Sequence, residues 1–238
     1  MSDVSIPAFV RPLALSALDD FFADSKKEDK GALALGLLAD VLGDGSDPVG
    51  MAKRRYQTVT DEAREPVIVP NHPSLMRHVI QPLREAKRCF VLNMPVACIA
   101  QAGLVGEMVA LWRFRMLDLS INGAAFDLRL QALLFGKEFD KLGQEQRVKV
   151  LSALDSLDDD TVRAFTDLRT IRRRYLHFMI DDKQNTETDA QRALRCANDL
   201  VLKTLDMKFD AGRIVLPPKV LNYINDILLA ATNQNESE

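Results

Sequence analysis

The chain has 238 residues, of which 47% are hydrophobic and 27% are charged, and its formal net charge is -3. This length suits one full domain with a smaller appendage, and the composition is ordinary for a soluble globular protein. The net charge excludes a generally basic nucleic-acid coat but is compatible with a local basic patch.

The three cysteines, Cys89, Cys98 and Cys196, are scattered and form no CxxC pair. They predict neither a disulfide framework nor a zinc cluster, and a reducing cytoplasm is the simplest location. No signal peptide is expected, because the N-terminus lacks a basic stretch followed by a long apolar one. The most apolar stretch, 95–112, is short for a membrane span and carries Gln101 and Glu107, so a buried helix is expected there and no membrane segment.

Helical patterns dominate the chain. Apolar residues recur at three- and four-residue steps in 12–24 and 30–43, and turn formers follow at 43–50. Residues 51–73 show no clear helical stripe and are interpreted as a linker, in which the basic run Lys53–Tyr56 forms a solvated loop. Further helices are expected at 74–94, 95–119, 125–135, 144–154, from the acidic cap at 155–160 onward, at 188–207 and at 219–231.

No run of alternating strands interrupts these helices, so the predicted fold class is all-α. The expected organisation is an N-terminal helical extension with its linker over 1–72, a helical bundle over 73–210, and an amphipathic helix with a tail over 211–238.

The most unusual segment is 167–178, DLRTIRRRYLHF, which concentrates four arginines, a tyrosine and a histidine. A helical wheel predicts one buried stripe and places Arg172 inside it, about 20° from Phe165. Arg163 and Arg174 point further out and are expected in solvent. The stripe consists of Phe165, Leu168, Tyr175, Leu176 and Met179, and Arg169, Arg173 and His177 share a neighbouring flank.

A guanidinium on a buried stripe needs a carboxylate partner or an interface. Glu107 is the one charged residue between Met94 and Trp112. The sequence therefore predicts an ion pair between Glu107 and Arg172, which would fix the register of two core helices.

His177 permits a different interpretation. Arg173 lies four residues before it, so both project from one face, about 40° apart, whereas Arg172 and His177 are about 140° apart. An imidazole can shuttle a proton near neutral pH, and a guanidinium can stabilise charge that develops on a phosphate.

The segment LRTIRRRYLHF, followed by a polar connector and a long last helix, resembles the HEPN superfamily, whose mark is an Arg-x4–6-His motif on the third core helix. Arg172 and His177 occupy the motif positions. The segments REAKRCFVLNMPVACIAQAGLVGEMVALW and FDKLGQEQRVKVL are similar to the earlier helices of HEPN-related domains. The resemblance covers about 73–208.

The resemblance implies a helical bundle, commonly a homodimer with facing motif helices, and a metal-free ribonuclease site. His177 would then assist proton transfer, Arg172 or Arg173 would stabilise the transition state, and Arg169, Arg174 and Tyr175 are candidate RNA-binding residues. Family members include toxins with a neutralising antitoxin or regulatory protein, phage-defence components and RNA-processing enzymes.

Two rival interpretations stay open. One is a non-catalytic helical interaction or regulatory module in which Arg172 is a structural residue paired with Glu107; the other is a small-molecule or nucleotide sensor. No cofactor and no metal are expected, because His72 and His78 have no cysteine or paired carboxylates at ligand spacing and no Gly-rich phosphate loop is present.

Overall fold

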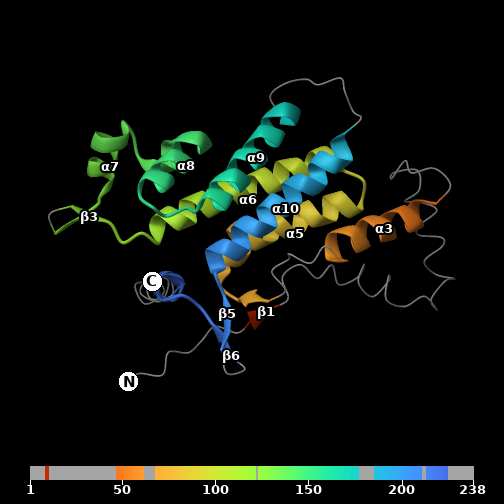
Figure 1. Ribbon diagram of the computed structural model, residues 1–238, viewed down its shortest axis with the longest axis horizontal. Helices are drawn as coiled ribbons and strands as arrows, with labels where there is room; N and C mark the ends of the chain where they lie inside the picture. The colour runs from red at the N-terminus through yellow and green to blue at the C-terminus, as the bar shows by residue number, and fades with distance from the viewer. Residues whose placement is uncertain are drawn as a thin grey trace, which may run out of the picture. The chain divides into compact units, whose positions relative to one another are not determined.

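The computed structural model describes residues 9–10, 47–61, 68–121, 123–176, 185–210 and 213–224. The fold is all-α, as predicted: helices dominate, and the strands of the described part form short antiparallel pairs (Figure 1). The chain divides into two compact units, Met1–Val105 with Asp167–Asp199 and Gly106–Thr166 with Leu200–Glu238. The expected boundaries near residues 72 and 210 stay predictions.

The first unit begins, in its described part, with strand β1 (Phe9–Val10), which pairs antiparallel with β2 (Val69–Pro70). Helix α3 (Pro48–Asp61) lies between them in sequence. Asp47 precedes α3 and accepts a hydrogen bond from Gly50 N at 2.8 Å, while Pro48 occupies the first turn, where its missing N–H costs nothing.

The interpretation of 51–73 as a linker is wrong, because α3 occupies most of its first half. The buried face of α3 consists of Ala52, Arg55 and Val59. Because the charged Arg55 occupies a buried position, the buried face of α3 does not show up as a stripe of apolar residues in the sequence. Arg55 Nε donates to Glu187 Oε1 at 2.9 Å. Lys53 and Arg54 are exposed on the same helix rather than in a loop.

Next in the chain is one helical stretch in three parts: α4 (Pro73–Leu75), a π-helical turn η1 (Met76–Ile80) and α5 (Gln81–Val91). Pro82 sits in the first turn of α5 and donates no backbone hydrogen bond, and the wider turn before it accommodates that loss. α3 packs against α5, and Figure 1 shows the two helices next to each other.

Helix α6 (Pro95–Arg115) is the longest described helix and ends before the predicted 119. It is the one described helix that is long and apolar enough to cross a bilayer, a test that the core helix of a soluble protein also passes, and half of its apolar window is buried. In the first unit its Cys98 Sγ contacts Ala190 O of α10 (Thr186–Leu205). α9 (Asp159–Leu176) supplies the remaining long helix of this unit.

The second unit contains the hairpin of β3 (Ser120–Ile121) and β4 (Ala124–Ala125), then α7 (Leu128–Phe135), the 3-10 turn η2 (Phe139–Lys141) and α8 (Gln144–Ala153). Its core includes an aromatic cluster in which Phe114 stacks on Phe139 with ring centroids 3.8 Å apart. Phe126 and Phe135 pack edge-on against Phe114.

The sequence-based prediction missed two hairpins, the β3–β4 hairpin described above and a second one near the C-terminus. β5 (Lys208–Asp210) pairs with β6 (Arg213–Val215), and a helical stretch over 218–224 follows. Their strands contain two or three residues each, which is too short for an alternating pattern to stand out.

Candidate functional site

The arginine-rich helix α9 begins with a complete cap. Asp158 Oδ1 accepts the backbone N–H of Thr161 at 2.6 Å, and Lys203 Nζ donates to the same oxygen at 3.0 Å. These hydrogen bonds favour the carboxylate and hold the pKa of Asp158 well below its usual range. The acidic run therefore fixes where α9 starts, as the sequence predicts.

The buried face of α9 contains Phe165, at 1% exposure, and extends through Leu168 to Ile171. Leu168 is 3% exposed and Ile171, one turn later, is equally buried, whereas Leu176 is 40% exposed. Phe165 and Leu168 are buried as predicted, but Leu176 was wrongly included in the stripe. Met179 lies outside the described residues, and Arg172 is half-buried.

The stem of Arg172 occupies a space that a glycine provides. A Cβ built on Gly103 of α6 meets Cδ of Arg172 at less than contact distance, with Nε and Cγ close behind. Any larger residue at position 103 must displace this stem. The stem of Arg172 therefore packs directly against the backbone of α6 at Gly103.

Arg174 and Tyr175 share one acceptor on the neighbouring helix. Arg174 Nη1 and Tyr175 Oη donate to Asp189 Oδ2 of α10 at 2.7 and 2.8 Å. Asp189 is 8% exposed. Burial and the Asp189 carboxylate raise the pKa of Tyr175. These two candidate RNA-binding residues thus tie the last turn of α9 to the first turns of α10.

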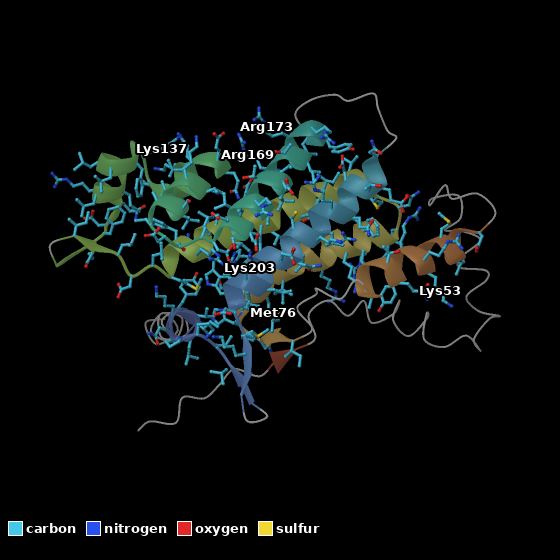
Figure 2. All side chains as sticks on the ribbon, viewed as in Figure 1. Lys53, Met76, Lys137, Arg169, Arg173 and Lys203 are labelled. Atoms are coloured by element: carbon cyan, nitrogen blue, oxygen red, sulfur yellow. The ribbon has the colours of Figure 1, made fainter. Side chains whose placement is uncertain are left out.

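Arg169, the third candidate RNA-binding residue, lies on the same side of α9 as Arg173 of the motif. Figure 2 shows Arg169 and Arg173 one turn apart on the same side of α9. Arg173 is exposed and Arg169 is half-buried. Arg192 Nη2 of α10 donates to Asp167 Oδ2 at 2.6 Å. This ion pair connects α10 to Asp167, the first residue of the arginine-rich segment.

The described part of the first unit carries an excess of positive charge. Its described residues include thirteen lysines and arginines against seven aspartates and glutamates, an excess of six. In the second unit the described residues carry twelve of each sign. Over its full ranges, 1–105 and 167–199, the first unit has nineteen residues of each sign and is neutral, so the positive excess belongs to its described part alone.

Glu107 belongs to the second unit, where it influences a buried arginine. Arg147 is 8% exposed and donates to the carbonyl oxygens of Phe139 and Asp140 at 3.3 and 2.7 Å. Burial lowers the pKa of Arg147, and the carboxylates of Glu107 and Asp140 oppose that effect. The Glu107–Arg172 pair links residues of different units and stays a prediction.

His177, the candidate proton-transfer residue, lies outside the described residues, directly after the last residue of α9. His78 is exposed, and His72 is buried as a helix cap. Within the described ranges no three His, Cys, Asp or Glu side chains gather as a metal site. The three cysteines are free thiols.

Sequence reasoning missed two residues that organise this region, Gly103 and Asp189. A glycine in an apolar helix indicates close helix contact but not the side chain it receives. Asp189 reads as an ordinary acidic residue in a helix's first turn. Comparisons with known protein families, curated proteins and solved structures give no match for this chain.

Proposed function

We propose that the chain is a HEPN-like, metal-independent endoribonuclease that acts as a homodimer, with His177 as the proton-transfer group and Arg172 and Arg173 as stabilisers of the transition state. The observation that carries the proposal is the basic cluster on the last turns of α9, where four arginines, at 169 and 172–174, directly precede His177. RNA is a polyanion, and a basic surface next to an imidazole is the chemistry its cleavage needs.

In the proposed reaction the ribose 2′-hydroxyl attacks the adjacent phosphorus and the bond to the 5′-oxygen breaks. His177 takes the hydroxyl proton or supplies one to the leaving oxygen. The arginines stabilise the additional negative charge on the phosphate oxygens. The packing of the Arg172 stem against Gly103 is compatible with this role, because it leaves the guanidinium beyond the contact with α6.

The decisive experiment incubates the purified full-length chain with single-stranded RNA in EDTA. Replacement His177→Ala is expected to slow cleavage by about a hundredfold or more, the usual contribution of a general acid or base. His78→Ala is the matched control, because His78 is an exposed histidine on η1, and it should leave the rate unchanged. Products should carry 2′,3′-cyclic phosphate ends.

The same variant separates binding from chemistry. His177→Ala should still bind RNA, with an affinity that falls as salt rises, because arginine–phosphate contacts release counterions. Cleavage by His177→Ala at the wild-type rate would refute the assignment of the histidine.

A second candidate is the non-catalytic interaction or regulatory module. The shared acceptor Asp189 favours it, because Arg174 and Tyr175 both donate to a residue of α10. Absence of both RNA binding and cleavage in the experiment above would favour this candidate. In this candidate function the chain would bind an antitoxin-like or regulatory partner protein, and α9 would carry out no chemical reaction.

A further inference from the structure

Two buried cations attach helix α3 to its neighbours in the first unit. Arg55 of α3 is 6% exposed, and its Nε donates to Glu187 Oε1 of α10 at 2.9 Å. Lys87 of α5 is 2% exposed, and its Nζ lies 5.0 Å from the ring centroid of Tyr56 on α3. These contacts fasten α3 to α5 and to the first turn of α10.

The pair of Arg55 and Glu187 differs from an ordinary surface salt bridge. The carboxylate side is 54% exposed, and a bridge between two such exposed groups contributes little to stability. The guanidinium side is buried, and a buried charge depends on its acceptors. A displacement of Glu187 therefore affects Arg55, and a displacement of Arg55 affects the turn of α10 that carries Glu187.

The same turn of α10 carries contacts to α9. Its Asp189 accepts hydrogen bonds from Arg174 Nη1 and Tyr175 Oη, and Thr186 hydrogen-bonds the same Tyr175 phenol. Glu187 lies between Thr186 and Asp189 in the sequence. The first turn of α10 thus contacts both α3 and the last turn of α9.

Helix α3 is an addition to the bundle that holds the arginine motif. It spans Pro48–Asp61, whereas the resemblance to the HEPN superfamily begins at about residue 73. The interpretations above give no role to the chain before that residue. The contact of α3 with Glu187 supplies one, because it connects this part of the chain to the end of α9 through a single turn of α10.

We propose that α3 positions the arginine motif: Arg55 fixes the first turn of α10 through Glu187, and that turn fixes the last turn of α9 through Asp189. The inference rests on the proposed function, because the last turn of α9 directly precedes His177. Arg55 is then a positioning residue and not a catalytic one. It acts through α10, and its buried guanidinium is not available to RNA.

The first measurement needs no enzymatic activity. Hydrogen exchange of the full-length chain, followed by mass spectrometry, reports on local opening of the last turn of α9 and the first turns of α10. Arg55→Met suits the buried position and should keep the fold, since an apolar residue can replace a buried charge. It should raise exchange in both segments about tenfold, the effect of losing one hydrogen bond to a charged group.

Two further variants identify the cause. Lys53→Met is the matched control, because Lys53 is an exposed cation of the same helix, and it should leave exchange in both segments unchanged. Arg55→Lys keeps the charge and should retain most of the protection. Far-UV circular dichroism verifies that each variant keeps its helices.

The second measurement separates positioning from binding. In single-turnover cleavage of single-stranded RNA in EDTA, Arg55→Met should lower the rate constant by about tenfold or more, because misplaced catalytic groups react slowly. The dissociation constant for RNA should stay within about twofold, since no phosphate contact is removed. Arg55→Lys should recover most of the rate, and Lys53→Met should match the wild type.

The outcomes distinguish this proposal from the proposed function. Unchanged exchange in Arg55→Met overturns the positioning role, whatever the chain does to RNA. Raised exchange with an unchanged cleavage rate, or with equal losses of rate and affinity, overturns it as well, because the contact would then be structural only. Raised exchange in a chain whose wild type cleaves no RNA supports the link from α3 to α9 and overturns the nuclease instead.

Discussion

At the scale of single residues, His72 links the fold of the first unit to pH. Its side chain is 2% exposed, and its Nδ1 accepts the backbone N–H of Leu75 at 3.4 Å, so the neutral ring carries its proton on Nε2. Nε2 is buried and finds no hydrogen-bond partner in the described part of the chain. Burial lowers the pKa of His72, because the charged form loses its hydration.

The expected consequence is a loss of stability in mild acid. The folded protein binds fewer protons at His72 than the unfolded chain does, so the free energy of unfolding rises with pH. It should fall as pH drops below about 6.5, the ordinary histidine value, by at most about 1.4 kcal/mol per pH unit. Urea unfolding between pH 7 and 5 measures it.

His72→Asn provides the comparison, because an asparagine oxygen can still cap Leu75 N but does not titrate in this range. The variant should be flatter than the wild type between pH 7 and 5. Replacement of the exposed His78 by Gln should leave the slope as it is. An equal slope in the wild type and in His72→Asn would assign the pH dependence to other groups.

At the scale of elements, the start of α9 depends on Asp158, which caps the helix and accepts from Lys203. Asp158→Ala should lower the free energy of unfolding by about 1 kcal/mol, the usual effect of removing an N-cap. Asp158→Asn should cost less, because it keeps the capping oxygen and loses only an exposed charge. Chemical denaturation of the three proteins at one pH ranks them; equal losses in both variants would mean that the charge and not the cap matters.

The helices show how far sequence patterns reach. The spacing of apolar residues and the terminal signals predict α5, α6, α8, α9 and α10 within a few residues. The spacing of apolar residues does not predict α3, because Arg55 occupies its buried stripe. The partner of Arg55 is Glu187, which lies in a distant part of the chain.

The candidate site was predictable to a lesser degree. The helix that carries the arginines and its start follow from local sequence. The contacts that distinguish one arginine from the next do not, since Gly103 and Asp189 are each about fifteen or more residues away from the arginine they meet, and periodicity within α9 does not report them.

At the scale of the whole molecule, three helices link the two units. α6, α9 and α10 each supply residues to both of them. A helix cannot unfold at one end without losing hydrogen bonds that stabilise the next turn, so we expect the units to unfold together in one transition.

Gly103→Ala tests this coupling, because it perturbs the first unit while Trp112, the sole tryptophan, reports on the second. The added methyl group displaces the stem of Arg172 and should cost about 1–3 kcal/mol, as overpacking does. Tryptophan fluorescence and far-UV circular dichroism should shift to the same lower denaturant midpoint. Gly143→Ser is the glycine control: a Cβ there meets no atom within 4 Å, its φ is -69°, and serine is favoured at this N-cap position of α8. A fluorescence midpoint that stays in place while the dichroism splits into two steps would show that the units unfold separately.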